Sequence, residues 1–237
     1  IRMRLVGSEM CIRDRRSSLA LRRRHLKRIY SRFKQFTMIP QATYVSNLFL
    51  ARRIEPIEGS IVECGVWKGG MSAGLATLLG SSRKYHLFDS FEGLPEAKQI
   101  DGEAAIDWQN DSKSENFYDN CTASEFDANE AMKLSGVKTY SLHKGWFSET
   151  IPSFTSDLPI ALLRLDGDWY DSTMTCLESL YDHVSPGGII ILDDYHTWDG
   201  CSRAVHDFLS RRSATERIRE FSGICYIEKR AASGQHN

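Results

Sequence analysis

Apolar runs separated by glycine- and proline-rich breaks recur along the middle of this sequence. The clearest are SIVECGV (60–66), KYHLFDS (84–90), VKTYSLHKG (137–145), IALLRLDGDWYD (160–171) and GGIIILDDY (187–195). Their length and β-branched content are typical of strands buried on both faces. Between and after these runs, apolar positions at helical spacing predict helices over residues 68–80, 124–134, 172–184 and 201–212. This alternation predicts an α/β fold with a mainly parallel, doubly wound sheet and helices on both faces.

The last two runs and the segment between them form a strand–helix–strand unit. Pro186-Gly187-Gly188 is expected to end the helix that begins near Ser172. Asp166, Asp193 and Asp194 then lie at the carboxyl ends of neighbouring parallel strands. In open α/β sheets this edge is where ligands bind.

Three further segments extend this core. Residues 16–56 are predicted to form a helical arm or lid, with a basic amphipathic helix over 17–36 and a second helix near 41–53, ahead of a domain over 57–237. Residues 96–121 are polar and weakly periodic, which indicates an insertion or mobile lid. Ser124 and Asp127 have the spacing of a helix-capping box. REFSGICYIEKR (219–230) suggests one or two closing strands.

Composition limits the classes of function. The 237 residues suit one α/β domain. Residues 1–34 carry 12 Lys/Arg and 2 Asp/Glu, whereas the remainder carries 18 and 29. The basic helix can pack on the domain or on another subunit, or dock on a membrane or nucleic acid, but the acidic body argues against a nucleic-acid partner. No apolar stretch approaches the roughly 20 residues of a membrane span, and six scattered cysteines without a CxxC pair favour a cytoplasmic protein. We expect a homo-oligomer.

The first fifteen residues are set apart from the fold. LVGSEMCIRDR (5–15) is similar to the translation of a sequencing-library adapter. Residues 1–15 are therefore not counted as part of the fold, and no role is expected for Cys11.

The acidic residues that follow the last two runs are candidate metal ligands. Carboxylates converging at a buried edge repel one another unless a cation lies among them. An all-oxygen set suits a hard cation such as Mg²⁺ better than Zn²⁺. Salt bridges to Arg164, Arg203 or Lys144 are the alternative explanation. Asp168 and Asp171 flank the cluster and are equally suited to cap the following helix.

The first two runs end in residues suited to a nucleoside cofactor. ECGVWKGG (63–70) joins a strand to a helix, and its glycines allow a ligand to approach the backbone, although tight turns also need glycine. It lacks the spacing of a dinucleotide fingerprint. Asp89, which ends the second run, is placed to accept hydrogen bonds from both hydroxyls of a ribose. A turn or cap aspartate is the simpler alternative.

Histidine and tryptophan side chains are also predicted at this edge. His143 and His196 are candidate bases, although a single histidine in such a loop is more often a packing residue. The four tryptophans in loops after strands offer aromatic surface for a flat ring or a sugar face: Trp67, Trp146, Trp169 and Trp198. Each of them is also suited to the core.

Six motifs in order carry a resemblance to a known family. They are IVECGVWKGGMS, FDSFEGLPEA, HKGWFSETIP, LDGDWYDST, LYDHVSPGGIIILDDY and GCSRAVHDF. Over residues 40–230 the chain resembles the macrocin O-methyltransferase (TylF-type) family. The resemblance implies a Rossmann-like class I methyltransferase fold with an N-terminal helical lid. It also implies S-adenosylmethionine as methyl donor, Mg²⁺ as metal, and a sugar hydroxyl on a natural product or glycan as acceptor.

Site roles follow from the same resemblance. Glu63 and Gly65 would contact the methionine end of the cofactor, with Trp67, Gly69 and Ser72 on the same loop. Asp89 and the adjacent Ser90 would lie at the ribose, and Gly145 and Trp146 at the adenine. The metal would be held by Asp166, Asp193 and Asp194. Asp166 or His196 would take the proton from the acceptor hydroxyl.

The sequence is also compatible with two other functions. A phenolic methyltransferase of the catechol type has the same architecture and differs in its acceptor. A nucleotide-sugar or NAD-binding module without transferase chemistry would not bind S-adenosylhomocysteine.

Overall fold

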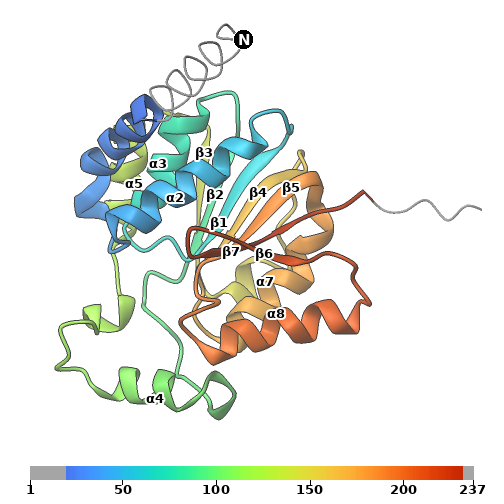
Figure 1. Ribbon diagram of the computed structural model, residues 1–237. Helices are drawn as coiled ribbons and strands as arrows, with labels where there is room; N and C mark the ends of the chain where they lie inside the picture. The colour runs from blue at the N-terminus through green and yellow to red at the C-terminus, as the bar shows by residue number, and fades with distance from the viewer. Residues whose placement is uncertain (1–19, 232–237) are drawn as a thin grey trace, which may run out of the picture.

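A mostly parallel sheet is the centre of the protein, whose computed structural model describes residues 20–231. The described strands form one sheet of order β3-β2-β1-β4-β5-β7-β6 (Figure 1). Five of them run parallel: β1 (Ser60–Cys64), β2 (Tyr85–Asp89), β3 (Tyr140–Lys144), β4 (Ile160–Leu165) and β5 (Val184–Leu192). The closing strands β6 (Ile218–Phe221) and β7 (Ile224–Glu228) are antiparallel. The predicted α/β class and the parallel sheet are confirmed.

Helices cover both faces of the sheet. One face carries the helix at residues 20–33, α2 (Gln41–Ala51), α3 (Gly70–Leu79) and α5 (Glu125–Ser135). The other carries α6 (Phe147–Thr150), α7 (Tyr170–Leu180) and α8 (Asp199–Arg211). Single 3₁₀ turns complete the chain: η1 (Lys34–Phe36), η2 (Arg52–Ile54), η3 (Gln99–Asp101), η4 (Tyr118–Cys121) and η5 (Tyr181–His183).

Alternation along the central strands fills two cores. In β4, Leu162 points to the core under α2, α3 and α5, and Leu163 points to the core under α7 and α8. Ile191 and Ile190 of β5 divide in the same way. Because both faces are covered, the central positions of these strands are apolar on both sides of the sheet, with Arg164 of β4 as an exception.

The basic amphipathic helix packs on the domain. Leu26, Ile29 and Phe33 lie on one helical face and are buried in the core beside α3 and α5, whereas the cations of the helix are exposed. The prediction that its apolar stripe would pack on the domain is confirmed. Residues 1–15, set aside as adapter-like, lie outside the described residues, as do residues 17–19 of the predicted helix.

The largest difference from prediction concerns the proline–glycine segment before the last parallel strand. It was expected to end a helix over 172–184. Instead α7 runs over Tyr170–Leu180, and β5 already begins at Val184, so that Pro186, Gly187 and Gly188 lie inside the strand. The pairing with β4 shifts register there, from Ile160 opposite Val184 to Leu162 opposite Ile189. The segment is a bulge in the sheet. Proline is tolerated at bulges as well as at helix ends, because its missing N–H does not interrupt a regular ladder there.

The polar segment 96–121 contains regular structure. It holds η3, the helix α4 (Glu103–Asn110) and η4, and α4 lies apart from the sheet, below the carboxyl ends of its strands (Figure 1). Weak periodicity in the sequence concealed α4, because a short helix that does not pack on the main core needs little apolar surface. Ser124 caps α5 as predicted, by accepting a hydrogen bond from Phe126 N.

The closing strands form a hairpin, which settles the prediction of one or two. The turn between β6 and β7 is Ser222-Gly223, both in the left-handed region. Across residues 20–231, we find no helix with the length and apolar content of a membrane span.

Candidate active site

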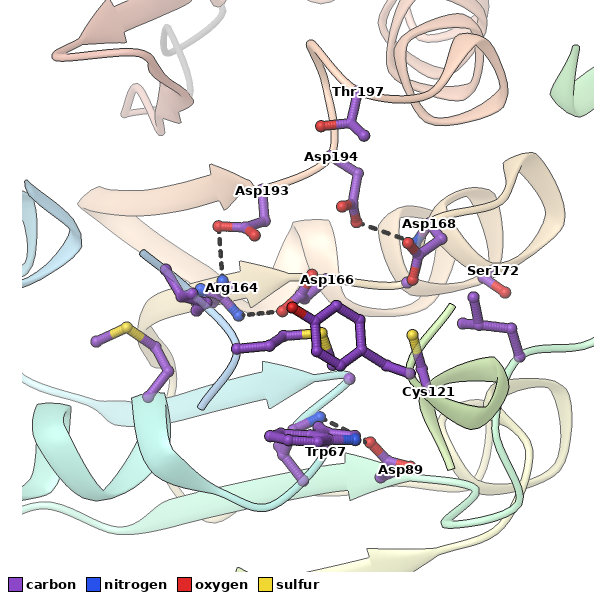
Figure 2. A pocket seen from close by; sticks show the side chains of 18 of the residues that line it. Trp67, Asp89, Cys121, Arg164, Asp166, Asp168, Ser172, Asp193, Asp194 and Thr197 are labelled. Atoms are coloured by element: carbon purple, nitrogen blue, oxygen red, sulfur yellow. Dashed lines mark hydrogen bonds and ion pairs between the residues drawn. The ribbon is translucent and has the colours of Figure 1, made fainter. Parts of the chain in front are cut away.

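A cavity of about 510 Å³ opens at the carboxyl ends of the parallel strands. Loops after β1, β2, β4 and β5 line it, as do the segment after η1 and parts of 93–121. The acidic side chains cluster at the ends of β4 and β5, and Trp67 and Asp89 lie across the cavity (Figure 2). The cavity thus has two sides, contributed by the two halves of the sheet.

The three predicted metal aspartates come together. Asp166 follows β4, and Asp193 and Asp194 follow β5, the strand beside it. Each offers one carboxylate oxygen, and these oxygens all lie within 4.8 Å of one another. Burial, with the neighbouring carboxylates as the second cause, raises the pKa of Asp194 well above the usual aspartate range.

A buried guanidinium lies among these carboxylates. Arg164 of β4 is fully buried, and its Nη1 is 2.7 Å from both Glu63 Oε1 and Asp166 Oδ2. Its Nη2 lies 2.6 Å from Asp193 Oδ1 as an ion pair. Arg164, one of the salt-bridge partners predicted from the sequence, therefore pairs with two of the three aspartates, Asp166 and Asp193.

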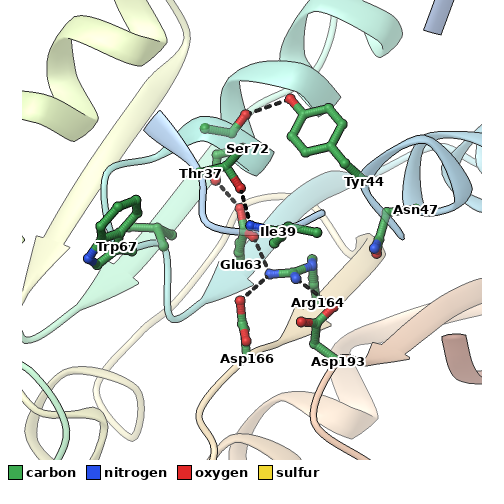
Figure 3. Close-up of polar contacts among 12 residues, drawn as sticks. Thr37, Ile39, Tyr44, Asn47, Glu63, Trp67, Ser72, Arg164, Asp166 and Asp193 are labelled. Carbon is green, nitrogen blue, oxygen red and sulfur yellow. Dashed lines mark hydrogen bonds and ion pairs between the residues drawn. The ribbon is translucent and has the colours of Figure 1, made fainter. Parts of the chain in front are cut away.

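Glu63 is 2% exposed and belongs to this network (Figure 3). Besides Arg164, it accepts a hydrogen bond from Ser72 Oγ on α3. Burial raises the pKa of Glu63, an effect that Arg164 opposes. Tyr44 of α2 donates to the Gly70 carbonyl at 2.7 Å, which ties the N-terminal arm to the same helix start.

Asp89 organises the loop that follows β1. Its Oδ2 accepts hydrogen bonds from Val66 N and Trp67 N, each at 2.8 Å, and its Oδ1 accepts from Phe91 N at 2.7 Å. Burial raises the pKa of Asp89, which these three backbone donors counteract. The carboxylate therefore holds the first two strand-end loops together, a role close to that of the turn aspartate weighed from sequence.

Six of the predicted cofactor residues line the cavity: Glu63, Gly65, Trp67, Asp89, Ser90 and Trp146. Three others do not, and the reasons are local. Gly69 is where α3 meets α5, since a Cβ there would contact the Ala128 backbone at 2.9 Å. Ser72 is turned to Glu63, and Gly145 packs on Thr150. The cofactor roles of all nine stay predictions.

Candidate bases differ in where their side chains point. His196 Nε2 lies 3.2 Å from Cys225 Sγ and 3.6 Å from Glu220 Oε2, toward the β6–β7 hairpin. His143 stacks on Phe88 within the strands. Asp168, which was only a flanking residue from sequence, lines the cavity. Burial raises its pKa to about 6.

Asp168 is held in a strained turn. Its φ is +57°, and its backbone N–H donates to Asp194 Oδ2 at 3.0 Å. Trp198 Nε1 donates to Asp168 Oδ1 at 2.8 Å. A non-glycine residue in the left-handed region is uncommon and needs such surrounding contacts to persist.

Trp108 of α4 is a cavity residue that sequence reasoning missed. Its ring centroid lies 5.9 Å from that of Trp198 and 6.3 Å from that of Trp169, in edge-to-face geometry. Trp67, Trp146 and Trp198 line the cavity as expected, whereas Trp169 is 2% exposed and belongs to the core. The available signal was Trp108 itself, an aromatic residue in an otherwise polar insertion.

The donor set fits Mg²⁺. Three carboxylates within reach of one another match the hard-oxygen preference of that ion, and no His or Cys completes the described cluster as zinc would favour. Arg164 contacts one oxygen of Asp166 and one of Asp193, and Asp168 N contacts one oxygen of Asp194. Each contact uses one oxygen of a two-oxygen group, which is compatible with coordination through the other.

The fold is that of class I S-adenosylmethionine-dependent methyltransferases. The chain superposes on the O-methyltransferase NovP with a TM-score of 0.68 at 24% identity, over 83% of each chain. It superposes on the calicheamicin methyltransferase CalS11 with a TM-score of 0.63 at 19% identity, over 88% of this chain and 91% of that one.

The sequence places the chain more narrowly. Residues 15–229 match the family described as Macrocin-O-methyltransferase (TylF), and the chain belongs to that family. The resemblance drawn from the six motifs is confirmed.

Three similar proteins come from Streptomyces and Micromonospora. A tetracenomycin rhamnosyl 4'-O-methyltransferase of Streptomyces olivaceus is 36% identical over 172 residues, 70% of this chain and 64% of that protein. Demethyldecarbamoylnovobiocin O-methyltransferase of Streptomyces niveus is 32% identical over 68% and 62%. Mycinamicin III 3''-O-methyltransferase of Micromonospora griseorubida is 30% identical over 69% and 65%. The chain thus spans slightly less than two thirds of each relative.

Proposed function

We propose that the protein is an S-adenosylmethionine-dependent, Mg²⁺-assisted O-methyltransferase that acts on a sugar hydroxyl of a natural product or glycan. The observation that carries this proposal is one cavity with a cofactor-type loop on one side and three convergent carboxylates on the other. Family membership supports the same reaction class, as do relatives named as a rhamnosyl-tetracenomycin 4'-O-methyltransferase and a mycinamicin III 3''-O-methyltransferase.

The loop after β1 and the end of β2 would hold the methyl donor. Gly65 lines the cavity with a φ of +87°, and the Asp166 carbonyl fills the space where a Cβ would lie, so only glycine fits the loop at this point. Asp89 fixes the loop through Val66 N and Trp67 N, and would offer its remaining acceptor capacity to ribose hydroxyls. Trp146 would border the adenine.

Asp166, Asp193 and Asp194 would hold Mg²⁺. When bound, Mg²⁺ supplies a Lewis acid that lowers the pKa of an alcohol and orients it. The three carboxylates lie across the cavity from Trp67 and Asp89 (Figure 2), so the acceptor would lie between the two sides. The remaining catalysis is positioning of the hydroxyl in line with the methyl group.

Asp168 is the side chain best placed to receive the acceptor proton. Its Oδ1 accepts a hydrogen bond from Trp198 Nε1, and the residue lines the same cavity as the aspartate cluster. Asp166 contacts Arg164 through one oxygen and is itself a proposed metal ligand, and His196, which also lines the cavity, has its Nε2 turned to Cys225. The earlier assignments to Asp166 and His196 therefore become second choices.

The aromatic wall beside the cluster suits the acceptor. Trp198 donates a hydrogen bond to Asp168, and the ring of Trp108 on α4 packs edge-to-face on that of Trp198. Indole faces pack well on the apolar faces of sugars and flat rings. We expect the enzyme to act as a homo-oligomer. We also expect it to act in the cytoplasm, where free thiols such as those of the described cysteines stay reduced.

Transfer of a labelled methyl group from S-adenosylmethionine tests the proposal. The acceptors are the compounds for which the relatives are named, a rhamnosyl tetracenomycin, demethyldecarbamoylnovobiocin and mycinamicin III, with catechol as the phenolic comparison. Each is assayed with 5 mM Mg²⁺ and with EDTA. We expect transfer to at least one glycoside, abolished by EDTA and absent with catechol. Binding of S-adenosylhomocysteine without transfer to any hydroxyl acceptor would contradict the proposal, as would EDTA-resistant turnover.

A further inference from the structure

Charge in the cavity is strongly unbalanced. Among the described residues that line it, six carry carboxylates and Arg164 alone carries a Lys or Arg charge. The carboxylates are Glu63, Asp89, Asp166, Asp168, Asp193 and Asp194. A guanidinium at this point is the cation already resident among groups that would otherwise repel one another.

The sheet itself places Arg164 between the two sides of the site. In the register of the parallel strands, Arg164 lies opposite Glu63 of β1 and opposite Ile191 of β5. Side chains alternate along a strand, so Asp166 and Asp193, two positions beyond Arg164 and Ile191, emerge on the same face. Figure 3 shows the guanidinium with Glu63 on one side and Asp166 and Asp193 on the other.

Arginine geometry suits this position. Nη1 donates hydrogen bonds to Glu63 and Asp166 at 2.7 Å each, while Nη2 forms an ion pair with Asp193 at 2.6 Å. A planar fork of donors can contact three carboxylates at once, which a single ammonium cannot do in the same directions. Because Arg164 is fully buried, its charge is tolerated only with these partners, and the partners depend on it in turn.

We propose that Arg164 is a positioning residue with two effects. Its guanidinium holds Glu63, Asp166 and Asp193 together before a divalent cation binds, and its charge weakens the binding of that cation. The second effect rests on the proposed function. It follows because Arg164 and the divalent cation compete for the same carboxylate charge at short range, where like charges repel.

A double-mutant cycle in EDTA tests the holding role by its sign. Glu63→Gln removes a partner of Arg164 in the parent protein, so we expect a lower melting temperature. In the Arg164→Met background the same change removes a buried carboxylate that has lost its cationic partner, so we expect the melting temperature of E63Q/R164M to be higher than that of R164M. If R164M is unfolded in EDTA, the E63Q/R164M protein is expected to regain cooperative unfolding. A double variant no more stable than R164M overturns the holding role, because a residue that only fills space gives additive losses.

Calorimetric titration with MgCl₂ tests the charge effect. We expect R164M to bind Mg²⁺ about tenfold more tightly than the parent protein. If R164M does not fold, E63Q/R164M is compared with E63Q in the same way. Arg164→Lys keeps the charge, so its Mg²⁺ affinity should stay within about threefold of the parent. Equal or weaker binding by R164M overturns this effect.

Arg83→Met is the matched control. Arg83 is a partly buried arginine that donates to the carbonyls of Gly59 and Ile54, away from the cavity. R83M should lower the melting temperature without changing Mg²⁺ affinity. If the parent protein binds no Mg²⁺, the metal part of the proposed function fails, while the cycle in EDTA still decides whether Arg164 holds the carboxylates.

Discussion

Glu63 and Arg164 lie opposite each other on adjacent parallel strands, and their side chains form an ion pair of 2.7 Å that is closed to solvent. Glu63 is the last residue but one of β1, which leads to the cofactor-type loop, and Arg164 lies two residues before Asp166 of the acidic cluster. The pair therefore joins the two sides of the proposed site through the sheet itself. A buried pair of this kind is poor evidence for stability, since desolvation offsets attraction, and better evidence for a fixed arrangement.

The acidic cluster should be required for metal-dependent transfer. Asp194→Asn keeps an oxygen for Asp168 N but loses a charged ligand, so we expect methyl transfer to fall at least about 100-fold. The residual rate should no longer respond to EDTA. Asp182→Asn is the control, because Asp182 is an exposed residue that pairs with Arg212. A D194N protein with full, EDTA-sensitive activity contradicts the metal role.

Asp89 should control cofactor affinity through the loop it holds. An asparagine presents one acceptor oxygen, whereas the Asp89 carboxylate uses both. Loss of a charge-assisted hydrogen bond costs about 1.5–3 kcal/mol, which corresponds to roughly 10–100-fold weaker binding of S-adenosylhomocysteine by D89N. Asp101→Asn is a close match, since Asp101 also accepts from two backbone N–H groups but does not line the cavity. D101N should lose stability and keep cofactor affinity.

Gly65 should tolerate no side chain. A Cβ there would overlap the Asp166 carbonyl, and its φ of +87° is unfavourable for other residues. We expect Gly65→Ala to cost about 3 kcal/mol or more and to abolish binding of S-adenosylhomocysteine. Gly136 has nearly the same φ, +85°, in open space, so Gly136→Ala should cost only about 1–2 kcal/mol and spare binding. Denaturant unfolding and calorimetry check both, and equal costs would contradict the steric argument.

The basic helix should be part of the folded domain. Phe33 is fully buried, so we expect Phe33→Ala to lower the free energy of unfolding by about 3–5 kcal/mol. Leu21, 63% exposed on the same helix, is the control, and Leu21→Ala should change stability by less than about 0.5 kcal/mol. If both variants unfold at the parent's denaturant midpoint, the helix does not contribute to the core.

Stability should fall in mild acid because of a histidine pair. Burial, then His143, lowers the pKa of His86 to about 4, and His86 Nδ1 lies 3.2 Å from His143 Nε2. Between pH 6.5 and 4 the unfolded chain therefore binds a proton at this position that the folded protein does not. The stability that the protein has with neutral His86 is therefore fully present above pH 6.5 and is lost as the pH falls toward 4. For a partly exposed group we expect a loss of about 1–2 kcal/mol.

Melting temperatures of the parent and of His86→Leu from pH 7.5 to 4 measure this effect. The variant should show a shallower decline below pH 6.5. Parallel curves for the two proteins would show that His86 does not contribute to acid sensitivity.

Much of this protein is readable from its sequence for physical reasons. Runs such as IALLRL and GIIIL predict strands buried on both faces, and parallel strands align their carboxyl ends. That geometry was enough to predict that Asp166, Asp193 and Asp194 lie close together, and in the structure they do. The bulge at Pro186 was not readable, because proline and glycine mark both helix ends and sheet irregularities.

Tertiary structure alone decided what each polar side chain contacts. Sequence offered Arg164, Arg203 and Lys144 as equal partners for the aspartates, and only strand register selects Arg164 by placing it opposite Glu63. It also turned His196 toward Cys225 and brought Trp108 of α4 beside Trp198. Periodicity along a chain reports which face a residue occupies, whereas contacts between loops depend on packing between distant segments, which has no period to read.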